Sequence, residues 1–265
     1  MTTAYLIAIA LYSTAIYLYL HKKTMISLQY LYKDNIVVIL LSAAILLFGV
    51  LHLSHHPIFC ILSIVAIIPI VILFICLLRF YRAPLRKVNM EEHGIVSPAD
   101  GHVIYIKQIA SGEMPISVKN GVKATLNEFA NTGLLDCPCW LVGINMTPLD
   151  VHKNCAPIDG TILLNKHFDG EFLSLKHEEA LRRNERNTIV IDHPNGKVGV
   201  VQTASRRVRR IVTYKKEGEM ITKGDWFGMI KFGSQVDLII PATCKLSVEL
   251  GQQVYARKTM MAWWT

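Results

Sequence analysis

Residues 58–78 read Ile58-Phe-Cys-Ile-Leu-Ser-Ile-Val-Ala-Ile-Ile-Pro-Ile-Val-Ile-Leu-Phe-Ile-Cys-Leu-Leu78, an apolar run without a charged side chain. A helix needs roughly 20 such residues to cross a hydrocarbon core about 30 Å thick. Two further uncharged apolar runs precede it, at residues 4–20 and 36–53. The run at 58–78 is long enough to span, the one at 36–53 is adequate, and the one at 4–20 is short. The sequence therefore predicts a membrane anchor over residues 1–78 with two or three transmembrane helices.

The two longer runs are joined by Ser54-His55-His56-Pro57, a polar turn whose proline suits the first turn of the next helix. They therefore form a hairpin, which returns the chain to its starting side. Basic residues flank this hairpin on both ends: Lys22, Lys23 and Lys33 before it, and Arg79, Arg82, Arg86 and Lys87 after it. By the positive-inside rule both flanks are cytoplasmic. We expect a protein of the cell (inner) membrane whose large domain faces the cytoplasm.

The N-terminal run has no basic residue before it and Lys22-Lys23 after it. This pattern favours an uncleaved anchor with its N-terminus outside over a cleaved secretory signal. In a reducing cytoplasm the cysteines of the large domain are expected to be free thiols, and they are Cys137, Cys139, Cys155 and Cys244.

The composition divides at the same point. The whole chain is 52% apolar and 18% charged, but residues 1–78 contain four charged residues and residues 79–265 contain the other 44 of 48. The second part therefore has the charge content of a globular domain. The net charge of +8 favours anionic partners, and with an anchor attached a lipid surface explains it without nucleic acid. Composition excludes a disordered, collagen-like or disulfide-scaffold protein.

Short apolar runs bounded by Gly, Pro, Asn and Asp follow one another from residue 95 onward. Runs of this length predict strands, at residues 102–106, 140–144, 161–164, 188–191, 197–203, 208–214, 236–240 and 244–248. One helix is expected around residues 174–183. We therefore expect a linker over residues 79–94, which contains Pro84 and mixed charges, and a mainly β (α+β) domain over residues 95–265.

The segment Phe232-Gly233-Ser234 precedes one of these strands. A Gly-Ser bond at a tight turn is chemically special, because glycine leaves its carbonyl unshielded and permits strained dihedrals, so the serine hydroxyl can attack it. An isolated Gly-Ser pair is more often a plain turn. The same holds for the two other candidates: Asp100 alone is more often a turn former, and His152 alone is more often a structural histidine. Together, a serine, a histidine and an acid can form a nucleophilic site.

Three further motifs have competing interpretations. The basic segment Arg206-Arg-Val-Arg-Arg210 either binds a lipid phosphate or the anionic leaflet, or is a solvated strand. Cys137-Pro-Cys139 lacks a companion Cys/His set at zinc spacing, so loop thiols and no metal site are expected. Trp263-Trp264 is either an interfacial anchor or a frayed terminus.

Six ordered motifs resemble those of phosphatidylserine decarboxylase proenzymes, in the short, pyruvoyl-dependent form. They are Arg79-Phe-Tyr-Arg-Ala-Pro84, Ile95-Val-Ser-Pro-Ala-Asp-Gly101, Met146-Thr-Pro-Leu-Asp-Val-His152 with Pro157 and Gly160, Asn184-Glu-Arg-Asn187, Arg209-Arg-Ile211, and Gly228-Met-Ile-Lys-Phe-Gly-Ser234 with Val236-Asp237 and Pro241. The resemblance covers about residues 79–250. It implies a phosphatidylserine decarboxylase-like domain after the transmembrane helices.

The resemblance also implies a self-processing enzyme. Cleavage at Gly233-Ser234 gives a large chain of residues 1–233 and a small chain of residues 234–265 whose Ser234 becomes a covalent pyruvoyl group. That group accepts the substrate amine and takes up electrons as carbon dioxide leaves. Asp100, acting through His152, matches the family's acid and histidine positions for removing the serine proton. Two positions depart from the family: Cys155 stands where longer members have a second histidine, and Gln235 where short members often have arginine.

The implied reaction is decarboxylation of phosphatidylserine to phosphatidylethanolamine at the bilayer. The enzyme would contain both the large and the small chain of the precursor. Its oligomeric state is not predicted. An archaeal-type ether-linked serine phospholipid is an alternative substrate, since the site sees mainly the headgroup. Two other functions remain: a noncatalytic membrane-anchored β domain that binds lipid, and a serine hydrolase that keeps the Ser234 hydroxyl.

Overall fold

The computed structural model of the chain describes residues 2–24, 28–53, 56–110, 113–117, 123–135, 137–171, 173–174, 180–205, 211–231 and 234–265. The chain divides into two compact units. The first comprises residues 1–81 with the short segment 147–149, and the second comprises residues 82–146 and 150–265.

The first unit is helical. Its elements are α1 (Thr2–Thr24), α2 (Leu28–Ile45), the π-helical turns η1 (Leu46–Val50), α3 (Leu51–Leu53) and α4 (Pro57–Tyr81). Three helical stretches are long and apolar enough to cross a membrane, namely Thr2–Lys22, Tyr32–Leu53 and Pro57–Tyr81. The two longer predicted runs are helical, and α4 begins at Pro57 as the turn chemistry predicts. That they cross a membrane stays a prediction. The first run also qualifies, because the helix extends beyond residues 4–20 at both ends.

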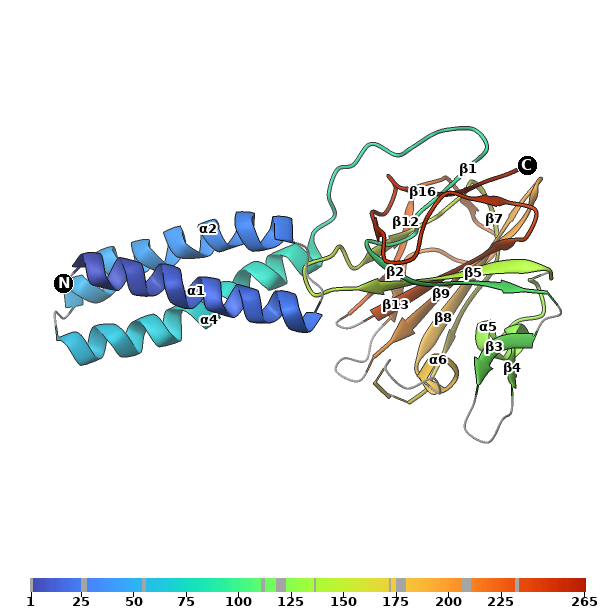
Figure 1. Ribbon diagram of the computed structural model, residues 1–265. Helices are drawn as coiled ribbons and strands as arrows, with labels where there is room; N and C mark the ends of the chain where they lie inside the picture. Colours follow the sequence, from blue (N-terminus) through green and yellow to red (C-terminus); the bar gives the residue numbers. More distant parts are fainter. Residues whose placement is uncertain are drawn as a thin grey trace. The chain divides into compact units, whose positions relative to one another are not determined.

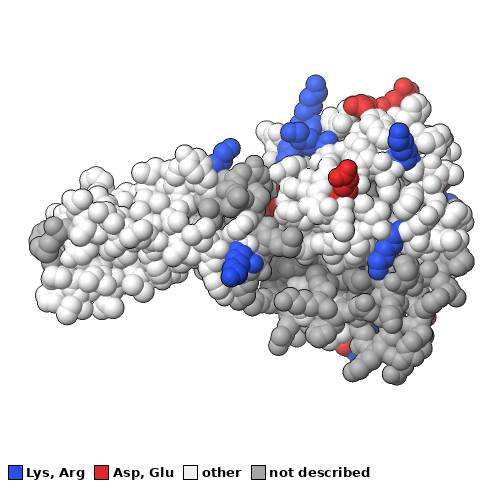
Figure 2. All heavy atoms as spheres, in the orientation of Figure 1, with Lys and Arg blue, Asp and Glu red and all other residues white. Residues whose placement is uncertain are grey.

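Apolar contacts and one ion pair hold these helices together. Tyr17 of α1, Val38 of α2 and Ile68 of α4 are buried against one another's helices, and Arg79 of α4 is paired with the buried carboxylate of Asp34 in α2. The opposite helix faces expose many large apolar side chains. On the face seen in Figure 2, the Lys and Arg side chains drawn in blue on the helical unit lie near one end of it. Such a surface is stable against lipid rather than water.

The second unit is mainly β. Its strands are β1 (Gly94–Val96), β2 (Gly101–Ile109), β3 (Glu113–Ser117), β4 (Lys123–Thr125), β5 (Cys139–Met146), β6 (Lys153–Cys155), β7 (Gly160–Phe168), β8 (Arg186–His193), β9 (Gly196–Ala204), β10 (Ile211–Thr213), β11 (Met220–Ile221), β12 (Trp226–Ile230), β13 (Ser234–Pro241), β14 (Lys245–Leu246), β15 (Gln253–Val254) and β16 (Met260–Trp263). Two short helices accompany them, α5 (Leu126–Ala130) and α6 (Ala180–Arg183).

Eight of these strands form one antiparallel sheet that curls into a half-barrel (Figure 1), in the order β11-β7-β8-β9-β13-β5-β2-β15. Two three-stranded sheets, β10-β12-β6 and β1-β16-β14, and the hairpin β3-β4 complete the unit. The larger apolar cluster fills one face of the half-barrel and the smaller cluster covers the other. In β13, Val236 and Leu238 join the larger cluster and Ile239 the smaller, as the twofold alternation of a strand requires.

All eight predicted strands are present, several of them longer than predicted. The strand expected at 208–214 is seen as β10, and residues 206–210 lie outside the described residues. Of the helix expected at 174–183, residues 180–183 are helical as α6, and residues 175–179 lie outside the described residues. The sequence analysis missed α5, although Thr125 and Glu128 form a capping box at its start.

The segment between the two units is attached to the β unit. From Arg82 the chain is extended, and its backbone is tied down where the Asn89 N–H donates to the Arg257 carbonyl. The Lys223 ammonium donates to the Glu91 carbonyl at 2.7 Å. These contacts hold the segment before Gly94 against the β unit, where the side chain of Arg86 is largely buried.

Candidate active site

Ser234 is the first residue of β13, near the middle of the eight-stranded sheet. Its backbone is paired with Met146 of β5 on one side and with Ala204 of β9 on the other, and both neighbours are buried. Gly233 and the side chain of Ser234 lie outside what the structure describes. The Gly233-Ser234 bond therefore immediately precedes a strand that is paired along both edges.

His152 is fully buried and is attached to both sides of this junction. The loop that carries it leaves β5 at Met146, directly opposite Ser234. Its carbonyl accepts a hydrogen bond of 3.1 Å from the N–H of Ile230, the last residue of β12, four positions before Ser234. The segment that carries the predicted histidine is thus bonded to β12 and follows the strand that pairs with Ser234. That His152 acts at the cleavage point stays a prediction.

The imidazole of His152 has the protonation expected of a base. Its Nδ1 is 3.0 Å from the Asp150 carbonyl oxygen, and because a carbonyl can only accept, Nδ1 carries the proton and Nε2 the lone pair. Burial lowers the pKa of His152 to about 4, an effect the Asp150 hydrogen bond opposes and nearby Arg82 reinforces. His152 is therefore neutral near pH 7 and can take up a proton at Nε2.

Asp100 is also fully buried, but it is not the turn former that an isolated Asp would suggest. Its Oδ1 accepts from the Ala256 N–H at 2.8 Å and its Oδ2 from the Val151 N–H at 3.4 Å. Among the described residues its side-chain partner is Arg86, not the His152 ring. Asp100 therefore positions the backbone next to His152. The neighbouring Gly101 has φ of +151°, and a Cβ there would lie 2.3 Å from the Asn145 carbonyl oxygen.

Arg86 is the residue that sequence analysis missed. Two of its nitrogens contact the two oxygens of Asp100, the second pair at 2.7 Å, and its guanidinium lies 5.4 Å from the centre of the Tyr255 ring. A guanidinium that contacts both oxygens offsets part of the cost of burying a carboxylate. Arg86 lies in the stretch expected to be a linker, where a basic residue is read as a membrane-flanking charge. A buried Asp100 would need a cationic partner, and this requirement was the clue that could have pointed to Arg86.

Cys155, which stands where longer family members have a second histidine, has a structural role. Its thiol donates to the Ser97 carbonyl at 3.3 Å, and its backbone N–H donates to the Pro98 carbonyl. Burial raises the pKa of the Cys155 thiol to about 12, so it stays protonated and cannot act as a base. These contacts join the segment that carries Asp100 to the segment that carries His152.

Gln235, the second departure, belongs to a buried polar cluster. Its Nε2 donates to the Tyr105 hydroxyl at 2.8 Å and to the Asp237 carboxylate at 2.9 Å, and the Tyr105 hydroxyl also donates to Asp237. Burial raises the pKa of Asp237 to about 7, against the lowering effect of its hydrogen bonds and of Lys107. The residue after Ser234 is therefore tethered by its own side chain.

The remaining motifs lie apart from these groups. Residues 206–210 and His55 are outside the described residues. Among the described residues no cluster of three or more His, Cys, Asp or Glu side chains could hold a metal, and Cys137 and Cys139 are free thiols. Trp264 stacks on the His193 ring with centroids 5.6 Å apart. The C-terminus is therefore packed rather than frayed.

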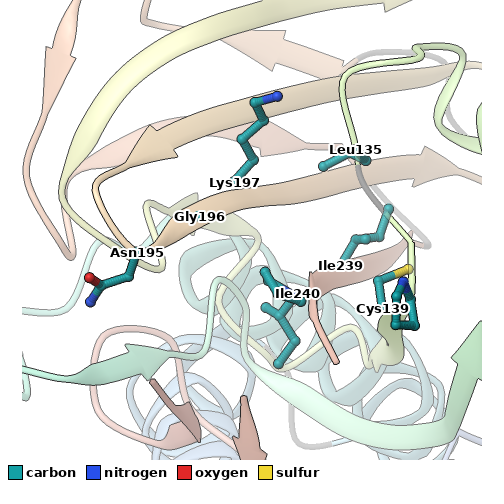
Figure 3. Close-up of a pocket in the computed structure, with 9 residues that line it drawn as sticks. Leu135, Cys139, Asn195, Gly196, Lys197, Ile239 and Ile240 are labelled. Atoms are coloured by element: carbon teal, nitrogen blue, oxygen red, sulfur yellow. The ribbon is translucent and has the colours of Figure 1, made fainter. Parts of the chain in front are cut away.

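A cavity of about 220 Å³ opens at the far end of β13 (Figure 3), lined by residues 239–241 together with Leu135, Pro138, Cys139 and residues 195–197. Ser234 is at the other end of the same strand, roughly 20 Å away at about 3.3 Å per residue. The cavity therefore does not belong to the candidate active site.

Comparison with known proteins agrees with this geometry. The family model described as phosphatidylserine decarboxylase matches residues 73–262. A protein of Methanocaldococcus jannaschii described as an archaetidylserine decarboxylase proenzyme is 44% identical over 185 residues, 69% of this chain and 87% of its own. Phosphatidylserine decarboxylase proenzymes of Ralstonia pickettii and Erythrobacter litoralis are 33% and 36% identical, each over 195 residues and 73% of this chain, and 81% and 75% of their own lengths.

The fold and these likenesses define a proenzyme-type phospholipid decarboxylase with apolar helices before its catalytic domain. The chain belongs to the phosphatidylserine decarboxylase family. The family membership predicted from the motifs is confirmed, and a noncatalytic β domain or a serine hydrolase is not supported.

Proposed function

We propose that the chain cuts itself between Gly233 and Ser234 and then decarboxylates phosphatidylserine to phosphatidylethanolamine. The observation that carries the proposal is His152, a buried neutral imidazole with its Nε2 lone pair free of the proton, attached to both β5 and β12 beside the junction. A general base in this place is what the serine hydroxyl needs in order to become a nucleophile.

In the proposed maturation His152 takes the Ser234 hydroxyl proton, and the oxygen attacks the Gly233 carbonyl carbon. The peptide C–N bond breaks as the nitrogen takes the proton from His152, which leaves an ester between the two residues and an amine on residue 234. Loss of the Cα proton of residue 234 then breaks its Cβ–O bond, which leaves a carboxylate on Gly233 and a Cα=Cβ enamine on residue 234. The enamine tautomerises to an imine. One water releases the nitrogen as ammonia, and residue 234 keeps a ketone.

The residues around position 234 fit a pyruvoyl group there. The pairing of β13 with β5 and β9 begins at residue 234 itself, and Gln235 is fixed by Tyr105 and Asp237, so a new chain end is held without its former neighbour. When formed, the group supplies a carbonyl that holds electrons as carbon dioxide leaves. We propose that His152, once protonated, returns a proton to the substrate carbon.

A second substrate is supported by one observation, the 44% identity to the protein described as an archaetidylserine decarboxylase proenzyme. The two lipids share the serine headgroup and differ in how the hydrocarbon chains are linked. Parallel assays of carbon dioxide release from ester-linked and ether-linked serine phospholipids, in the same detergent micelles, distinguish them. A preference of more than about tenfold for the ether lipid would assign the second substrate.

Maturation is tested by the mass of the purified protein. We expect a small chain of residues 234–265 with a blocked N-terminus, and Ser234→Ala should remain a single inactive chain. An intact chain with an unmodified Ser234 in active membranes would contradict the mechanism. The reaction is also proposed to occur on the cytoplasmic side, because the basic flanks of the helices favour that orientation.

A further inference from the structure

Four side-chain amides form a buried chain across the face of the half-barrel that holds the larger apolar cluster. Asn187 Nδ2 donates to Asn165 Oδ1 at 2.9 Å and to Gln202 Oε1 at 3.2 Å, and Gln202 Nε2 donates to Asn154 Oδ1 at 2.7 Å. Asn154, Asn187 and Gln202 are each fully buried. Apolar side chains would be expected at these positions, since Gln202 follows Val198 and Val200 along the same face.

A backbone carbonyl fixes the direction of every amide in this chain. Asn165 Nδ2 donates to the Lys215 carbonyl at 2.7 Å, and a carbonyl can only accept. Asn165 must therefore present its oxygen to Asn187, and Asn187 its nitrogen to both neighbours. Gln202 in turn presents its oxygen to Asn187 and its nitrogen to Asn154. Asn154 therefore accepts this bond with its Oδ1, and its Nδ2 takes no part in the chain of amides.

Asn154 Nδ2 is buried and has no hydrogen-bond partner among the described residues. A buried amide donor left unpaired is destabilising, so an acceptor oxygen that reaches Asn154 Nδ2 would be bound favourably. The site is built for this amide. A Cβ on Gly228, the residue of β12 opposite Asn154, would lie 3.2 Å from Gln202 Nε2 and 2.8 Å from the Val212 carbonyl oxygen.

The unpaired donor lies next to the candidate active site. Asn154 is two residues after His152. Gln202 is directly opposite Val236 in β13, and two residues further along both strands Ala204 is opposite Ser234. Two residues of strand span roughly 7 Å. A serine headgroup attached through its nitrogen at residue 234 extends over a similar distance, so its oxygens can reach this amide.

We infer that Asn154 binds an anionic oxygen of the substrate's serine headgroup, and that Gln202 and Asn187 position it. This inference rests on the proposed function. The shared chemistry is an anionic oxygen, which the headgroup offers on its carboxylate and on its phosphodiester. A neutral donor suits a carboxylate that must leave as uncharged carbon dioxide, because an ammonium or guanidinium partner would stabilise the ground state more than the transition state.

Two substitutions remove the donor in different ways. Asn154→Asp keeps the oxygen that Gln202 contacts and loses both N–H groups. Gln202→Glu leaves Asn154 unchanged but offers it a carboxylate, so that Asn154 Nδ2 turns inward. Each should lower kcat/KM for phosphatidylserine about ten- to a hundredfold per cleaved small chain, mainly through KM, as expected for losing a hydrogen bond to a charged group.

The matched control is Thr203→Val. Thr203 is next to Gln202 in β9, pairs with Gln235 rather than Val236, and its buried hydroxyl has no hydrogen-bond partner among the described residues. This variant should keep kcat/KM within about threefold of the wild type, since no hydrogen bond is lost.

Binding of the product shows which headgroup oxygen Asn154 contacts. Phosphatidylethanolamine keeps the phosphodiester of the substrate and lacks its carboxylate. The mature full-length enzyme in detergent micelles is heated with and without phosphatidylethanolamine. If the substitutions abolish the increase in unfolding temperature that the product causes, the contact is to the phosphodiester, and if they raise KM and leave that increase intact, it is to the carboxylate.

Values of kcat/KM within about threefold of the wild type in both variants would overturn the inference. If cleaved wild-type enzyme releases no carbon dioxide from any serine phospholipid, the proposed function fails instead.

Discussion

The guanidinium of Arg86 and the carboxylate of Asp100 form a two-point ion pair in which the acid is fully buried and the base is 18% exposed. Asp100 also accepts two backbone hydrogen bonds, from Val151 and Ala256. Residues from the start, middle and end of the β unit therefore meet at one carboxylate beside His152. Asp100 and Arg86 therefore position His152 indirectly, because Asp100 bonds the Val151 N–H in the residue before it.

Arg86→Ala should leave this carboxylate buried without a cation. We expect a loss of about 3–5 kcal/mol of stability and accumulation of uncut precursor, measured by thermal unfolding and by gel electrophoresis. Lys87→Ala removes the exposed neighbouring charge and should change neither. Normal processing and unfolding temperature in Arg86→Ala would remove Arg86 from the site.

Asp100→Asn keeps the shape of the acid and removes its charge, so the ion pair with the Arg86 guanidinium is lost. We expect the variant to remain a single uncut chain, because the Val151 backbone next to His152 loses a charged acceptor. If Asp100→Asn is processed at the wild-type rate, Asp100 has no part in maturation.

Self-cleavage should depend on pH through His152, which must be neutral to take the serine proton. Because burial lowers its pKa to about 4, the rate of processing of newly synthesised precursor should be constant from about pH 8 to about pH 6 and half-maximal near pH 4. The same shift makes the His152 contribution to stability complete above its unfolded pKa of about 6.5 and lost as the pH falls through 4. A midpoint near 6.5 would mean that an unshifted histidine controls the step, and His152→Ala should not be processed at a measurable rate.

Asp237 should make the protein less stable as the pH rises. Its pKa is raised to about 7 by burial, whereas an unfolded Asp titrates near 3.9, so the folded state binds the extra proton between these values. The stability it contributes is complete below about pH 4 and is lost by about pH 7, by an amount on the order of a few kcal/mol. Unfolding temperatures of Asp237→Asn should therefore fall less over this range than those of the wild type. The exposed Asp169 gives the control, since Asp169→Asn should leave the slope unchanged.

The orientation of the β unit can be tested at Cys137, the exposed thiol among the cysteines. A membrane-impermeant maleimide should label it in inside-out vesicles and not in right-side-out vesicles. Cys137→Ser should remove the label, because the other thiols of the β unit are buried. Labelling of right-side-out vesicles would place the domain outside and contradict the positive-inside interpretation.

The sequence predicted the parts of the fold that rest on local patterns. Long apolar runs predicted the helices, and short runs between turn residues predicted most strands of the large sheet. Burial of one or both faces of an element requires apolar residues at regular positions, and this pattern can be seen in the sequence. Several of the shortest strands, β6, β11 and β15, were not predicted, because two or three residues are too few to show a periodic pattern. Trp226–Ile230 was not among the predicted strands, yet it is β12, and its Gly228 makes room for the Gln202 amide.

The candidate site was predictable only in part. Ser234, His152 and Asp100 were singled out by their motifs, and the structure holds the backbone of Ser234 close to the segments that carry the other two. Arg86 and Asn154 were not found, because pairing with a buried acid or a buried amide depends on long-range contacts that spacing does not encode. Gln202 carried a usable signal, a polar residue at a position where the strand alternation requires an apolar one.

Ser234 opens a strand that is flanked on both sides, and the 32 residues from there to Thr265 supply β13 to β16. A chain severed before β13 would stay assembled through its sheet, but as a heterodimer without a covalent link. Refolding such a pair is a second-order process, slower on dilution, whereas the precursor folds as one molecule. The mature enzyme would then stay active because its two chains separate slowly. Conditions that unfold the precursor reversibly would inactivate the two-chain enzyme irreversibly.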